Sequence, residues 1–120
     1  MPQVTLYGLD NCDTCRKARN WLQRFEVAHD FIDYRAQPIP VEMLKAWAAK
    51  LGGWGTLVNR ASSTWRSLSD SRKSPGSDPE WTLLIKEYPA LVKRPVVVLD
   101  EDVSVGFTDN GFKKKFGVGK

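Results

Sequence analysis

Two cysteines three positions apart, Cys12 and Cys15, are the residues of this chain best suited to chemistry. They follow a β-branched and aromatic run, Val4–Tyr7, which predicts a strand, and a short segment of turn-forming residues, 8–11. The second thiol of a Cys-x-x-Cys pair can attack a mixed disulfide formed on the first. In a strand–loop–helix setting, the pair therefore favours redox or nucleophilic chemistry.

The residues after the loop predict an amphipathic helix. Ala18, Trp21, Leu22 and Phe25 recur at i, i+3, i+4 and i+7, while charged and amide side chains fill the other face. Cys12 then lies at the helix N-terminus, where free N–H groups carry partial positive charge. Such a position lowers the pKa of a thiol and makes its sulfur reactive near neutral pH.

Two structural roles for the cysteines are alternatives to redox chemistry. A zinc site needs about four ligands, whereas the chain has two Cys, one His and no second Cys-x-x-Cys, so we expect no metal. Two inert thiols in the core are the stronger alternative, because free cysteine is often simply buried. The single histidine, His29, precedes a predicted strand, and we expect it at the surface.

Composition indicates one soluble domain. The chain has 120 residues, of which 42% are hydrophobic and 27% charged. No apolar run approaches the roughly 20 residues that span a bilayer, and Met1–Thr5 lacks the pattern of a signal peptide. We expect a cytoplasmic protein without a membrane partner. The net charge of +4 is mild and no nucleic-acid-binding motif is present, so small anionic substrates are expected rather than direct nucleic-acid contact.

The order of the predicted elements defines a fold class. The first strand, the first helix and a strand at 30–34 form a βαβ unit, whose strands are expected to be parallel. A helical region follows, with a strong helix start at Ser77–Glu80, and then a hairpin at 94–106 and a last helix. We therefore expect an α/β, thioredoxin-like fold, β-α-β … β-β-α, with a four-stranded mixed sheet. A single domain, 1–120, would carry a helical insert at about 40–90.

Several short motifs spread over the chain resemble those of a known family. The motifs are Thr5–Gly8 leading to Asn11–Ala18, then Leu57–Arg60, Thr64–Arg66 and Lys93–Pro95. Together they resemble the ArsC/Spx family, and most closely its YffB-type branch, which is related to arsenate reductases. The resemblance covers essentially the whole chain. It implies a thioredoxin-like fold with a helical insert, in agreement with the element order.

The same resemblance implies a set of site residues. The nucleophilic cysteine of the family corresponds to Cys12, its anion-contacting arginines to Arg60 and Arg94, and its cis-proline to Pro95. A planar guanidinium suits this role, since it holds a carboxylate or an oxyanion through two parallel hydrogen bonds. Cys15 would then be the resolving thiol. The default alternative for each arginine is a surface ion pair.

Three functions follow from the resemblance and stay open at this point. The first is a thiol–disulfide oxidoreductase with no bound cofactor and with glutathione as co-substrate. The second is an arsenate reductase; against it, Val105–Thr108 has no arginine where the arsenate-reducing branch carries a third. The third is a redox-sensing transcriptional regulator of the Spx type, which would bind the α subunit of RNA polymerase and use Cys12 and Cys15 as a switch.

Overall fold

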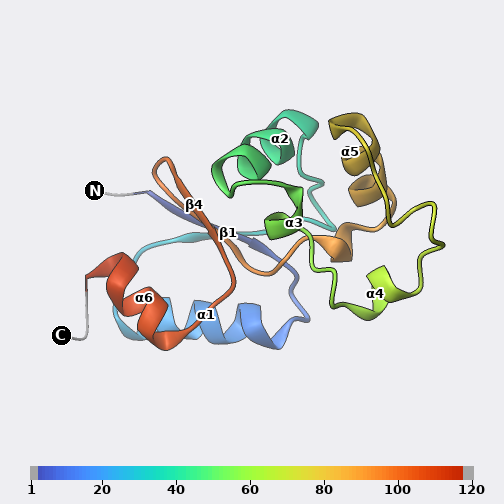
Figure 1. The fold of residues 1–120 in the computed structure, drawn as a ribbon. Coiled ribbons are helices and arrows are strands. Elements are labelled where there is room, and N and C mark those ends of the chain that lie inside the picture. The colour runs from blue at the N-terminus through green and yellow to red at the C-terminus, as the bar shows by residue number, and fades with distance from the viewer. Residues whose placement is uncertain (1–2, 118–120) are drawn as a thin grey trace. The chain divides into compact units, whose positions relative to one another are not determined.

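The computed structural model describes residues 3–117 and divides the chain into two compact units. Figure 1 shows strands and helices in the first unit, residues 3–33 with 94–117, and helices in the second, Tyr34–Lys93. The second unit spans residues 34–93, whereas the sequence predicts a helical insert at about 40–90 within one domain. Residues 1–2 and 118–120, which the sequence interpretation included in its span, lie outside the described part.

A four-stranded sheet with the order β2-β1-β3-β4 forms the first unit. Its strands are β1 (Val4–Gly8), β2 (Asp30–Asp33), β3 (Val96–Leu99) and β4 (Asp102–Val105). β1 and β2 are parallel, whereas β3 is antiparallel to both β1 and β4. The helix after β1 completes a βαβ unit, and β3 and β4 form the hairpin. This arrangement confirms the predicted thioredoxin-like class with a mixed sheet.

Two helices, α1 (Asp13–Arg24) and α6 (Asp109–Phe116), share an aromatic core with the sheet. The ring centroids of Trp21 and Phe112 are 5.3 Å apart in an edge-on arrangement, a geometry that contributes about 0.5–1.5 kcal/mol beyond area burial. The Trp21 indole N–H also donates to Asp109 Oδ1 over 2.7 Å. The predicted apolar stripe of the first helix is therefore the surface that anchors it. Other buried members of this core are Val4, Leu6, Ala18, Leu22 and Val97.

The second unit is helical. It contains α2 (Val41–Lys50), α3 (Trp54–Leu57), α4 (Ser63–Arg66), α5 (Asp78–Glu87) and a 3₁₀ turn, η1 (Pro89–Leu91). Trp81 stacks on both Trp54 and Trp65, with ring centroids 6.0 Å apart in each pair. An isolated β-bridge joins Val58 to Val92. Within residues 3–117, no helix is long and apolar enough to cross a membrane.

The start of α5 forms as its sequence predicts. The Ser77 hydroxyl accepts a hydrogen bond from the Glu80 N–H over 3.4 Å, which caps the first turn. The Glu80 carboxylate reaches back to the N–H of Gly76 over 3.1 Å. In the usual capping box this second bond goes to the N–H of the cap residue itself, so the box is present but displaced by one residue.

The helical spacing of Trp81, Leu84, Ile85 and Tyr88 predicts that these four residues form the buried face of α5, and the structure differs from this prediction in part. Leu84 and Ile85 are buried as expected, but Trp81 is only partly buried. Tyr88 is 38% exposed, so its predicted burial is wrong. It is the C-cap, with φ −131° and ψ 74°, and its side chain no longer follows the helical stripe. Thr82 is buried instead, because its hydroxyl donates to the carbonyl of the preceding turn and needs no other partner.

Candidate active site

Cys12 is the N-cap residue of α1. Its backbone is extended (φ −99°, ψ 123°), and its carbonyl accepts the first helical hydrogen bond, from Arg16 N–H, over 3.0 Å. Its own N–H donates to the Leu9 carbonyl over 3.2 Å, which closes the turn after β1. The Cys12 side chain is partly exposed. The thiol is thus held at the helix N-terminus and remains accessible to a reactant.

Opposing effects act on the Cys12 thiol, and its pKa is lowered overall. Partial burial alone would raise the pKa, but the N–H and thiol of Cys15, the charge of Arg94 and the N–H of Thr14 together outweigh it. The sulfur does not form a cap hydrogen bond of ordinary geometry. The N–H groups of the first turn, together with the Cys15 thiol and the charge of Arg94, therefore stabilise the Cys12 thiolate.

Cys15 has the opposite character. The residue is 1% exposed. Burial, and to a lesser degree the neighbouring Cys12, raises the pKa of the Cys15 thiol to about 12. The sulfur lies against the backbone of Gly8, where an added Cβ would come within 2.4 Å of it. Gly8 is a site residue that the sequence interpretation missed, since the loop prediction and the family motif Thr5–Gly8 include it without giving it a role at the site. Cys15 is therefore a protonated, enclosed thiol beside a more acidic and accessible one.

The sheet register accounts for the place of Arg94. Tyr7 of β1 pairs with Val96 of β3 in antiparallel register. Arg94 precedes Val96 by two residues, as Leu9 follows Tyr7 by two, so both segments leave the sheet at the same end. The charge of Arg94 accordingly lowers the pKa of Cys12. The peptide bond between Arg94 and Pro95 is cis, which agrees with the family resemblance.

Arg60 belongs to the second unit. Its guanidinium lies over Gly55, where an added Cβ would be 3.0 Å from Arg60 Nη2. The preceding residue, Asn59, donates its N–H to the Leu91 carbonyl over 2.8 Å. Arg60 takes no part in the ion pairs found within residues 3–117. Its assignment to the thiol site continues to depend on the family resemblance.

The two acidic residues nearest to the thiol loop, Asp10 and Asp13, each lie beside an arginine of α1. Arg16 forms an ion pair with Asp13 over 2.9 Å, and Arg19 lies 3.9 Å from Asp10. Exposed pairs of this kind contribute little to stability, but they place positive charge beside the two carboxylates nearest to the loop. Among residues 3–117, no group of three or more His, Cys, Asp or Glu side chains could hold a metal ion.

A mixed sheet that places a cysteine at the N-terminus of its first helix defines a thioredoxin-like protein with a candidate thiol site. The sequence profile of the ArsC family matches residues 7–114, and the chain belongs to that family. The match extends over both compact units and confirms the resemblance seen in the short motifs.

Individual relatives agree with this family. An uncharacterized protein of Haemophilus influenzae is 33% identical over 113 residues, which cover 94% of this chain and 98% of its own. The global transcriptional regulator Spx of Enterococcus faecalis is 29% identical, with 92% and 84% covered. Among solved structures, a YFFB protein superposes with a TM-score of 0.85 at 38% identity, covering 93% of this chain and 97% of its own. An ArsC-related protein from Brucella melitensis gives a TM-score of 0.75 at 34% identity, with 97% and 96% covered.

Proposed function

We propose that this member of the ArsC family is a cytoplasmic thiol–disulfide oxidoreductase, with Cys12 as its nucleophile and glutathione as its co-substrate. The observation that carries the proposal is the contrast between the two thiols. Cys12 is partly exposed with a lowered pKa, whereas Cys15 is enclosed with a raised one. A thiolate at a helix N-terminus is the form that attacks a disulfide.

The reaction has two exchange steps. The Cys12 thiolate attacks one sulfur of the substrate disulfide; that S–S bond breaks, a mixed disulfide forms, and the leaving thiolate takes up a proton. In the second step Cys15 loses its proton and attacks the Cys12 sulfur, so that the second thiol leaves and Cys12–Cys15 becomes a disulfide. Two molecules of glutathione then reduce this disulfide and become oxidised glutathione.

The raised pKa of Cys15 is compatible with its proposed role as resolving thiol. The nearby Cys12 contributes to this raised pKa. Once Cys12 is held in a mixed disulfide it carries no negative charge, so that contribution disappears. The effect of burial remains, opposed by a backbone hydrogen bond from Leu9 and by the charge of Arg94, and Cys15 becomes a better nucleophile at the stage when it is needed.

Arg94 and Arg60 are proposed to hold the carboxylates of glutathione or another anion. For Arg94 the support is its place at the thiol end of the sheet and its effect on the pKa of Cys12. For Arg60 the support is the family resemblance. Pro95 follows Arg94 directly in the chain and is assigned to the same site.

Steady-state turnover with glutathione and a small mixed disulfide tests the proposal. We expect Cys12→Ser to abolish turnover, and Cys15→Ser to accumulate a glutathione adduct on Cys12 that mass spectrometry detects. Thermal unfolding of both variants controls for loss of fold. A Cys12→Ser protein that keeps the wild-type rate, or a wild-type protein without glutathione turnover, contradicts the proposal. Arsenate, assayed in parallel, tests the arsenate-reductase alternative.

The Spx relative supports a second candidate function. In this case the protein is a redox-sensing regulator that binds the RNA polymerase α subunit, and the Cys12–Cys15 disulfide changes that binding. A binding assay with purified α subunit, using the protein in its reduced and oxidised forms, separates the two candidates. Redox-dependent binding without glutathione turnover favours the regulator.

A further inference from the structure

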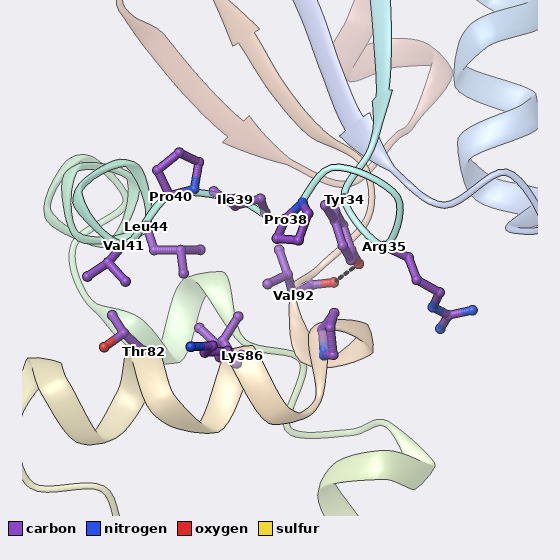
Figure 2. A pocket seen from close by; sticks show the side chains of 12 residues that line it. Tyr34, Arg35, Pro38, Ile39, Pro40, Val41, Leu44, Thr82, Lys86 and Val92 are labelled. Carbon is purple, nitrogen blue, oxygen red and sulfur yellow. Dashed lines mark hydrogen bonds between the residues drawn. The ribbon is translucent and has the colours of Figure 1, made fainter.

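A pocket of about 470 Å³ lies within the second unit, and neither thiol contributes to its lining. Figure 2 shows Val41 and Leu44 of α2 opposite Thr82 and Lys86 of α5, with the segment Pro38–Pro40 along another side. The volume falls in the range of about 300–1,000 Å³ that is usual for small-molecule sites. The segments that form the pocket are far apart in the sequence but belong to one compact unit.

The walls of the pocket are largely apolar. The two hydroxyl groups in the lining already use their protons within the fold. Tyr34 Oη donates to the Val92 carbonyl over 2.9 Å, as the dashed line in Figure 2 shows, and Thr82 Oγ1 donates to the Pro79 carbonyl over 3.1 Å. A ligand in the pocket therefore meets mainly carbon. The aliphatic residues of the lining are Ile39, Val41, Leu44, Ile85 and Val92.

The charges at the pocket are of one sign. Arg35 and Lys86 line it, and no carboxylate does so among the described residues. Figure 2 shows the Arg35 side chain extending away from the other lining residues, whereas Lys86 lies among them. Within residues 3–117, Lys86 forms no ion pair or hydrogen bond through its side chain. An anionic group would thus complement the charge that the pocket presents.

We propose that this pocket binds a small amphipathic anion, namely a carboxylic acid with an apolar body. The apolar body occupies the cavity between α2 and α5, and its carboxylate pairs with the Lys86 ammonium. A neutral molecule of the same shape gains the apolar contacts but not the ion pair, and a cation is repelled. The proposal depends only on contacts within the second unit and is independent of the thiol chemistry.

Decanoate and decanol are suitable probes, because they differ in charge and share an apolar chain. We expect decanoate to shift the amide signals of pocket residues in a ¹H–¹⁵N titration of the full chain. Lys86→Met removes the charge and keeps the aliphatic stem. We expect it to weaken decanoate binding by about tenfold, the lower end of the effect of losing one charge-assisted contact, because Lys86 is exposed to solvent, and to leave decanol binding unchanged. Lys45→Met is the matched control, since Lys45 is an exposed lysine of α2 that does not line the pocket.

A second variant tests the cavity itself. Val41 lies on the pocket rim and is 49% exposed, so Val41→Trp can fill the space without disturbing a packed core. It should reduce the binding of both probes while the unfolding temperature stays close to that of the wild type. The proposal is overturned if decanoate leaves the pocket signals unchanged, or if Lys45→Met weakens its binding as much as Lys86→Met. It is equally overturned if decanoate binding survives Val41→Trp in a folded protein.

Discussion

Gly8 and Cys15 approach so closely that a Cβ on Gly8 would lie 2.4 Å from the Cys15 sulfur. Gly8 ends β1 and Cys15 lies in the first turn of α1, so one contact joins the two elements that carry the candidate site. Gly8 is not among the residues with positive φ. Position 8 therefore requires glycine because a larger residue would clash with the side chain at position 15, and the backbone conformation imposes no such requirement.

This contact predicts that the cost of Gly8→Ala depends on Cys15. In the wild type, the added methyl group should lower the free energy of unfolding by roughly 1–3 kcal/mol, as overpacking does. In a Cys15→Ala background the sulfur is absent, and the next contacts, 3.3 Å to Phe31 and 3.5 Å to the Cβ of residue 15, are much easier to accommodate. Denaturant unfolding of the four proteins gives the coupling energy. Equal costs of Gly8→Ala in both backgrounds would show that the sulfur does not occupy this space.

Cys12 should be the first thiol to be alkylated. It is the more exposed of the two thiols and has the lower pKa. Limiting iodoacetamide at neutral pH, followed by mass mapping, should therefore find the label on Cys12. Because the thiolate is the reacting form, the rate should rise with pH around a midpoint below the ordinary thiol value of 9.0. Preferential labelling of Cys15 would reverse the assignment of nucleophile and resolving thiol.

Cys15 should make the stability of the protein sensitive to alkaline pH. Its pKa is raised to about 12 in the folded protein, so the unfolded chain loses this proton at lower pH than the native one. The contribution of the protonated thiol is complete below the unfolded pKa near 9 and is lost as pH rises toward 12. Urea unfolding at several pH values should give a steeper alkaline decline for the wild type than for Cys15→Ala. Parallel declines in the two proteins would argue against a raised pKa.

Arg94 should affect both the thiol and the anion. Arg94→Ala removes a positive charge that lowers the pKa of Cys12, so the alkylation midpoint should rise. Loss of one charge-assisted contact should also weaken glutathione binding by roughly ten- to a hundred-fold. Arg94→Lys should restore only part of this binding, because an ammonium lacks the bidentate geometry.

Arg24→Ala is the matched control for the arginine variants, because Arg24 lies in the last turn of α1, at the end opposite Cys12. Arg60→Ala tests the second arginine separately, since the support for that residue comes from the family alone. If Arg60→Ala and Arg94→Ala both leave glutathione binding and turnover unchanged, the anion site is assigned to the wrong residues.

Much of the first unit could be predicted from local sequence pattern. The stripe formed by Ala18, Trp21 and Leu22 fixes the buried face of α1, since a helical period allows only one such face. The element order then fixes parallel pairing of β1 and β2. The predicted start of α1 also places Cys12 at the N-terminus of that helix, so the position of the thiol can be predicted from a short stretch of the chain.

Other features depend on contacts between distant parts of the chain. The space shared by Gly8 and Cys15 arises from the way β1 meets α1, and a glycine at the end of a strand gives no sign of it. The pocket beside Lys86 forms where separate segments of the second unit converge. The error at Tyr88 has a local cause: the spacing extended the helical stripe one residue too far, into the C-cap.

The stacked indoles of the second unit have an optical consequence. Trp81 lies nearly parallel to Trp54 and Trp65, with interplanar angles of 7° and 14°, whereas Trp21, the tryptophan of the first unit, meets Phe112 edge-on. Indoles packed this closely influence one another electronically, so their near-ultraviolet circular-dichroism signal depends on the intact stack. Loss of that signal reports melting of the second unit, and the part of the fluorescence change that Trp21→Phe removes from the wild type reports melting of the first. The protein thus carries separate spectroscopic reporters for its two units, and these can show whether the units unfold in one transition or in two.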